Sequence, residues 1–93
     1  MIGPMTLRQF VEDMDSLDDE LTIFWTTDGD ISGDSIVFLV DLNEEDEPDE
    51  LKEFIDVWHA RDVIKGKISV AGLVDPDLFT KTNLLLNYAE NGA

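Results

Sequence analysis

The stretch "LTIFWTTDGDISGDSIVFLVDL" (residues 21–42) decides the fold class of this 93-residue chain. Its two ends, residues 21–26 and 35–42, are rich in β-branched and aromatic residues and too short for independent helices, so both are predicted strands. The polar, glycine-containing residues between them are typical of a long hairpin loop. Both alternating faces of the second strand are apolar, which predicts an interior strand covered at least in part on both sides.

An amphipathic helix is predicted before this hairpin, over residues 5–17. Its apolar residues recur at the spacing of a single helical stripe: Leu7, Phe10, Val11 and Met14. Thr6 followed by Gln9 forms a capping box, in which each side chain binds the backbone N–H of the other residue. Met5 before the cap and Phe10 within the helix fit a hydrophobic staple.

Residues 51–66 admit two interpretations. The helical stripe of residues 51–58 would continue into Arg61, Asp62 and Lys65, so it ends there. A second stripe begins with Ala60, Val63 and Ile64. We therefore predict a strand over about 53–58 and a short helix from His59 to Gly66, a favourable residue after a helix end. A helix over 49–58 is the alternative.

The rest of the chain predicts a loop over 67–74 and a last helix. Asp75 is its predicted N-cap, with Pro76 at the first helical position and Asn91-Gly92 closing it. Its predicted buried face consists of Leu78, Phe79, Leu85, Leu86 and Ala89. The order α-β-β-β-α-α indicates one α+β domain over residues 1–93, with helices packed on a three-stranded, mainly antiparallel sheet and an acidic linker at 43–50.

The charge of the chain is strongly segregated. The formal net charge is −16, from 22 acidic and six basic residues. Residues 1–58 hold 18 acids and two bases, whereas residues 59–93 hold four of each. This composition argues against direct binding to nucleic acid or to an anionic membrane. With no cysteine, no signal-peptide pattern and no apolar run of spanning length, we expect a cytoplasmic protein.

The sequence offers only weak candidates for metal binding or catalysis. Residues 28–34 match the early ligand positions of an EF-hand loop with Asp28, Asp30, Ser32 and Gly33, but Leu39 stands where the closing glutamate belongs. We interpret this segment as a polar loop.

The ionisable side chains that could serve catalysis are equally weak. His59 is the one histidine of a chain without cysteine, which predicts a structural or surface role. Asp41 ends an apolar strand and Asp56 lies between Ile55 and Val57, and we expect both to face solvent. We therefore predict no enzyme, no cofactor and no metal site. A metal-binding module or enzyme using residues 28–34, or Asp41 and Asp56, is the alternative.

The densest charge lies in "LNEEDEPDE" (residues 42–50), which has no basic residue. We predict a partner-binding face made of Glu44, Glu45, Asp46, Glu47, Asp49 and Glu50. Such a face attracts the basic surface of a protein that handles nucleic acid, and it imitates phosphate charge. Inhibitors, immunity proteins and anti-defence proteins work in this way. The alternative is a solvated loop that only keeps the protein soluble.

Four segments, taken in order, resemble a family of small, acidic, largely uncharacterised bacterial proteins. They are "MTLRQFVEDMDSLDDELTIF", the acidic linker with its proline, "EFIDVWHARDVI" and "LLNYAENGA". Family members keep a short apolar strand followed by a helix start of the kind seen at residues 60–63. The resemblance implies the α+β fold and a bacterial or phage origin, and it implies no catalytic residue. Residues 26–34 depart from the family pattern.

Overall fold

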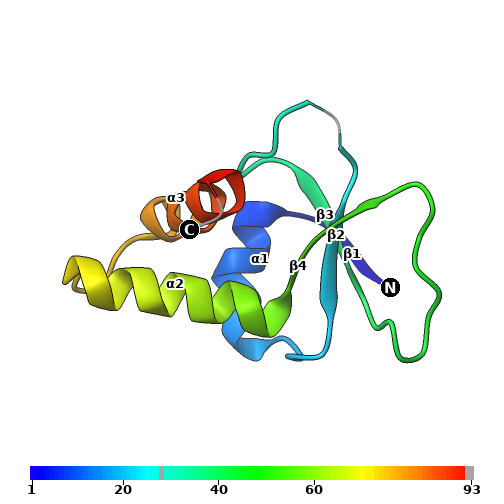
Figure 1. The fold of residues 1–93 in the computed structure, drawn as a ribbon, viewed down its shortest axis with the longest axis horizontal. Coiled ribbons are helices and arrows are strands. Elements are labelled where there is room, and N and C mark those ends of the chain that lie inside the picture. Colours follow the sequence, from blue (N-terminus) through cyan, green and yellow to red (C-terminus); the bar gives the residue numbers. More distant parts are fainter. Residues whose placement is uncertain (28, 92–93) are drawn as a thin grey trace.

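The computed structural model describes residues 1–27 and 29–91, without the side chain of Asn91. Its elements are β1 (Ile2–Thr6), α1 (Leu7–Asp13), a 3-10 turn η1 (Met14–Ser16), β2 (Thr22–Trp25), β3 (Ile36–Val40), β4 (Lys52–Asp56), α2 (Val57–Ala71) and α3 (Leu78–Asn91). The predicted α+β class is confirmed. The sheet of the described residues is antiparallel and has four strands in the order β1-β3-β2-β4 (Figure 1), so the prediction of three strands was wrong.

The strand missing from the prediction is β1, which pairs with β3. It contains Gly3-Pro4, a sequence typical of turns. Proline is tolerated here because β1 lies at the edge of the sheet, where one side of the strand needs no ladder hydrogen bond. Gly3 has a φ of 121°, and a Cβ atom there would lie 3.0 Å from the carbonyl oxygen of Val37. The position therefore favours glycine.

Helix α1 begins at Leu7, so the predicted start at Met5 was two residues early. The capping box is confirmed: the Gln9 N–H donates to Thr6 Oγ1 (3.1 Å), and the Thr6 N–H donates to Gln9 Oε1 (2.9 Å). The predicted stripe of Leu7, Phe10, Val11 and Met14 is buried throughout. The α-helix ends at Asp13, and η1 continues the chain to Ser16.

The strand prediction after the acidic run is confirmed by β4, and a helix over 49–58 is excluded. Helix α2 starts at Val57 rather than His59 and runs through Gly66 to Ala71, so the predicted end at Gly66 was wrong. Ile68 packs against the core beyond Gly66. The helix instead ends at Gly72, whose φ of 67° is the left-handed conformation that glycine adopts without strain.

Helix α3 is capped by Asp77, not by the predicted Asp75. The Thr80 N–H donates to Asp77 Oδ1 (2.8 Å), whereas Asp75 has a φ of 50°. Leu85 is buried as predicted, but Phe79 is 66% exposed and Ala89 is also exposed. The predicted closing Gly92 lies outside the described residues.

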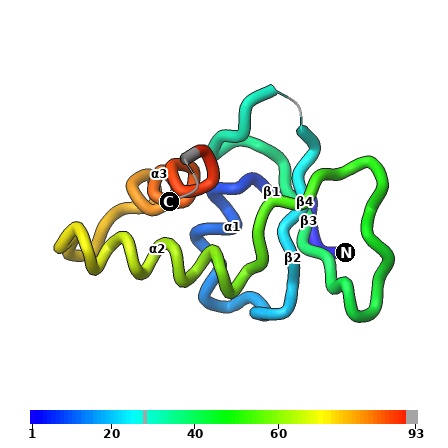
Figure 2. Tube along the Cα trace, in the orientation of Figure 1, coloured from blue at the N-terminus to red at the C-terminus, as the bar shows by residue number. Residues whose placement is uncertain are grey.

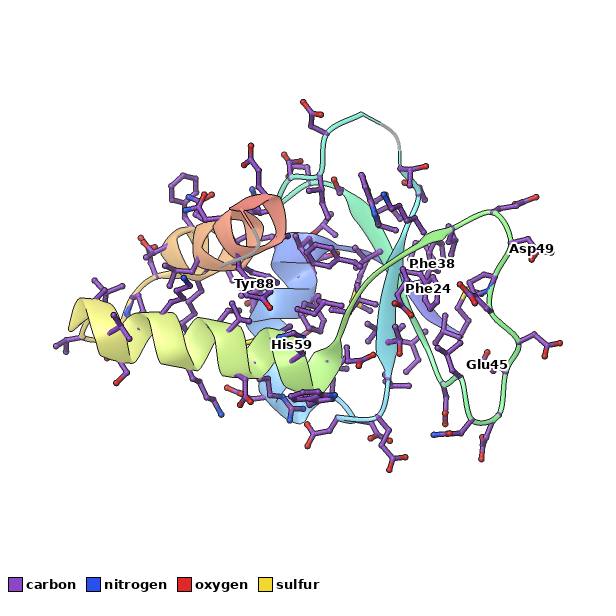
Figure 3. The ribbon with its side chains drawn as sticks, viewed as in Figure 1. Phe24, Phe38, Glu45, Asp49, His59 and Tyr88 are labelled. Carbon is purple, nitrogen blue, oxygen red and sulfur yellow. The ribbon has the colours of Figure 1, made fainter. Side chains whose placement is uncertain are left out.

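The three helices lie on one face of the sheet and enclose the main core with it (Figures 1 and 2). The core side chains of the central strands include Ile23, Val37 and Leu39. On the opposite face, Phe24 and Val40 are fully buried although the helices lie elsewhere. Figure 3 shows Phe24 and Phe38 pointing toward the segment that connects β3 to β4. The prediction that β3 is covered on both sides is therefore confirmed.

Candidate functional site

The segment between β3 and β4, residues 41–50, forms a loop with seven acidic residues and no base; we call it the acidic loop. It leaves the sheet at the end of β3, passes over the sheet face that the helices leave open, and returns into β4 (Figures 1 and 3). A hollow of about 440 Å³ lies beneath it, with the apolar residues Met1, Phe38, Pro48 and Leu51 among its lining. The loop thus belongs to the cover of the sheet and is not only a linker.

The first half of the acidic loop is a hydrogen-bonded turn built around Asp41. The carbonyl oxygen of Asp41 accepts from the N–H groups of Glu44 (3.0 Å) and Glu45 (2.7 Å). Its Oδ1 accepts from the N–H of Asn43 (3.0 Å), which is the local bonding typical of aspartate in turns. These bonds fix the direction in which the following carboxylates leave the sheet.

Glu45 differs from the other predicted binding residues because its carboxylate is used within the fold. It contacts the amine of Met1, and its Oε2 accepts from the Asp41 N–H (3.1 Å). The bond from the Met1 amine, and then the bond from Asp41, hold the pKa of Glu45 below its ordinary value. Glu45 therefore stabilises the turn, which the sequence alone did not indicate.

The remaining five predicted binding residues are exposed: Glu44, Asp46, Glu47, Asp49 and Glu50. Within residues 1–27 and 29–91, no ion pair includes any of the five. Acids elsewhere do meet bases: Asp34 pairs with Arg8 (2.6 Å), Asp19 with Arg61, and Asp15 with Lys65 (3.9 Å). These three acids are therefore paired with bases of the chain, whereas the five carboxylates of the acidic loop are not paired within the described residues.

The five exposed carboxylates lie far from most of the basic residues. The longest dimension of the molecule is 39 Å, and the acidic loop and the far end of α2 lie at its two ends (Figure 1). Four of the six bases belong to α2 and α3: Arg61, Lys65, Lys67 and Lys81. Since charges in physiological salt are screened over about 8 Å, these bases do not neutralise the acidic loop.

The alternative calcium loop receives little support from the geometry. Asp28 lies outside the described residues, and Asp34 is paired with Arg8. Ser32 takes part in the turn itself, because its Oγ accepts from the Asp34 N–H (3.3 Å). Leu39, at the position of the closing glutamate, is fully buried in the core. Among the described residues, no three acidic, histidine or cysteine side chains gather in a way that would hold a metal ion.

Asp41 and Asp56 were expected to face solvent, and both are instead partly buried and hydrogen-bonded. Asp56 Oδ1 accepts from the Thr22 hydroxyl (2.8 Å) on the neighbouring strand, while Asp41 is held in its turn. Asp56 ends β4, and Asp41 follows the last residue of β3. Since β3 and β4 lie on either side of β2, the Cα atoms of the two residues are about 10 Å apart. Each carboxylate has a structural role, and the arrangement gives no support to acid–base catalysis.

His59 joins two aromatic residues at the start of α2. Its ring stacks on Trp58, with centroids 5.2 Å apart, and meets the edge of Tyr88, with centroids 5.5 Å apart. The Tyr88 hydroxyl lies 3.0 Å from His59 Nε2, and Trp58 remains 49% exposed. Figure 3 shows His59 and Tyr88 facing each other from α2 and α3. The sequence could not indicate this pair, because the two residues are 29 positions apart.

No protein-family model, curated protein or solved structure matches this chain. None of the described helices has the length and apolar character needed to cross a membrane. The functional interpretation therefore depends on the geometry and charge of the molecule itself.

Proposed function

We propose that this chain is a non-enzymatic, cytoplasmic interaction protein that presents the acidic loop to a basic surface of a partner protein. One observation carries the proposal: the acidic loop, whose first half is a turn hydrogen-bonded around Asp41, bears five exposed carboxylates that have no ion-pair partner among the described residues. The acids near the helices, by contrast, include three that pair with bases of the chain.

The partner that fits this loop is a protein that handles nucleic acid. Surfaces that bind the phosphate backbone are lined by lysine and arginine, which bind carboxylates as they bind phosphates. A loop that occupies such a surface excludes nucleic acid from it, as an inhibitor, immunity or anti-defence protein does.

The loop should act on the rate of association more than on the lifetime of the complex. Charged loops attract an opposite surface before contact and raise association rates, and salt reduces this effect. Exposed ion pairs add little affinity because water competes for both partners. Stable binding therefore requires further contacts outside the five carboxylates.

The test uses a nine-residue peptide of alternating arginine and valine as the basic probe, with its association rate followed by stopped-flow fluorescence. In the loop variant, the five exposed carboxylates become Gln or Asn. In the control variant, five exposed acids elsewhere change in the same way: Glu12, Asp13, Asp62, Asp75 and Glu90. Both variants carry a net charge of −11, because five charges are removed from −16.

We expect the loop variant to associate with the peptide about tenfold more slowly than the wild type at low salt, and the salt dependence of its rate to flatten. The control variant should stay within about twofold of the wild type. Equal slowing of both variants would show that net charge alone acts, and that the acidic loop only keeps the protein soluble.

A further inference from the structure

A second hollow, of about 520 Å³, lies beside β4 at the junction of the sheet with α2 and α3. All five residues of β4 line it, which means that it follows the strand along its whole length. The other lining residues come from β2, the β2–β3 loop and the two helices: Trp25, Ile31, His59, Tyr88 and Ala89. The hollow has room for at least one long side chain.

Strand β4 lies at the outer edge of the sheet and carries an irregularity in its middle. Ile23 pairs with Ile55 and Phe24 pairs with Glu53, so Phe54 is an extra residue with no opposite residue in β2. Such bulges are frequent at sheet edges. An edge strand presents backbone N–H and C=O groups that another extended segment can pair with. The hollow beside β4 would receive side chains from such a segment.

The lining of the hollow suits a cationic side chain. Trp25 and Tyr88 provide aromatic rings, and Tyr88 is held in place by its contact with His59 (3.0 Å between Oη and Nε2). The lining residues include two acidic residues, Glu53 and Asp56, and one basic residue, Lys52; Asp56 Oδ1 also accepts from the Thr22 hydroxyl. Arginine side chains combine stacking on aromatic faces with hydrogen bonds to carboxylates.

We propose that β4 binds an extended, basic segment of the partner by strand addition, and that the hollow receives an arginine or lysine side chain of that segment. This inference rests on the proposed function, since it takes the partner to be basic. The acidic loop leads directly into β4, with Glu50 two residues before Lys52. A segment attracted by the loop would therefore arrive beside the strand that holds it.

The test measures equilibrium binding of the arginine–valine peptide by fluorescence in a Trp58→Phe background. Trp25 is then the one remaining tryptophan, and it lines the hollow. We expect peptide binding to change its emission and to slow hydrogen exchange of the β4 amides. Tyr88→Ala should raise the peptide Kd about tenfold. Phe79→Ala, on the same helix but 66% exposed and outside the hollow, should leave it unchanged.

Two further measurements test the β4 site even if Tyr88→Ala does not fold. Glu53→Lys changes an exposed side chain on β4 and should also weaken binding, whereas Glu12→Lys, which makes the same change of charge on α1, should not. A peptide with four consecutive N-methylated residues at its centre keeps its charges but cannot pair with a strand, so we expect it to bind far more weakly.

The outcomes separate this inference from the proposed function. Unchanged peptide affinity in both Tyr88→Ala and Glu53→Lys would overturn the β4 site, even where the loop variant binds slowly. Equal binding of the N-methylated peptide would overturn strand addition. If the β4 variants weaken binding while the loop variant behaves like its charge-matched control, the docking role of the acidic loop fails and the β4 site stands.

Discussion

Arg61 on α2 should contribute more to stability than any other charged side chain we have described. Its Nε donates to the Met14 carbonyl oxygen (2.8 Å), a second nitrogen donates to the Leu17 carbonyl oxygen, and a third pairs with Asp19. The side chain is only 17% exposed, whereas that of Asp19 is 60% exposed. One guanidinium thus holds η1 and the following turn against α2.

The expected cost of losing this group follows from the bonds to carbonyl oxygens. A hydrogen bond from a charged donor contributes about 1.5–3 kcal/mol, and Arg61→Met removes two of them while keeping an apolar side chain of similar length. With the lower value for each bond, we expect a loss of about 3 kcal/mol of unfolding free energy, from a total of roughly 5–14 kcal/mol for a chain of this length. At 4–8 °C per kcal/mol, the melting temperature should fall by roughly 12–24 °C.

The assay is urea and thermal unfolding of Arg61→Met and Asp19→Asn, followed by circular dichroism. Asp19→Asn removes only the exposed ion pair and should cost less than about 1 kcal/mol. Similar losses in the two variants would show that the ion pair, and not the bonds to the carbonyl oxygens, carries the effect. A loss below about 1 kcal/mol in Arg61→Met would refute the reasoning altogether.

Four other substitutions test the helix ends. Thr6→Ala should lower the free energy of unfolding by about 1 kcal/mol in a urea titration, because the capping box loses its hydroxyl acceptor; an unchanged value would contradict the cap. Gly66→Ala should raise the free energy of unfolding by about 0.5–1 kcal/mol, whereas Gly72→Ala should lower it because Gly72 has a φ of 67°. Changes of the same sign in the two variants would mean that α2 ends elsewhere. Bonds from the Thr80 N–H and hydroxyl hold the pKa of Asp77 below its ordinary value. The ionised Asp77 therefore stabilises the fold at pH values above its unfolded-state pKa, and this contribution is lost as the pH falls through its folded-state pKa. The melting temperature should therefore fall more steeply with acid in the wild type than in Asp77→Asn between about pH 5 and 2, and parallel curves would argue against this role.

Features that depend on neighbouring residues were predictable from the sequence. The capping box of Thr6 and Gln9 spans three positions, and the apolar stripe that follows needs only helical periodicity. The strands at 22–25 and 36–40 were predicted within two residues at each end for the same reason. The acidic run is also local, and five of its six predicted residues are exposed.

Features that depend on distant contacts were not predictable. Gly66 and Gly72 are both reasonable helix ends, and packing of Ile68 against the core favours continuation past Gly66. The role of Arg61 arises from carbonyl groups 44 and 47 positions earlier in the chain. The hollow beside β4 combines residues from four parts of the chain, from Trp25 to Ala89. Patterns of neighbouring residues do not predict such long-range contacts.

The two proposed sites, the acidic loop and the hollow beside β4, would contribute to different steps of binding. The exposed carboxylates of the acidic loop are well placed to attract a basic surface, but water limits the affinity that they can add. The hollow beside β4 has aromatic residues in its lining and follows an edge strand, and by our proposal these would hold a segment once it has arrived. Because the loop continues into β4, the proposed attraction and retention would act on neighbouring parts of one ligand. Neutralising the loop should therefore change the association rate, and altering Tyr88 should change the dissociation rate.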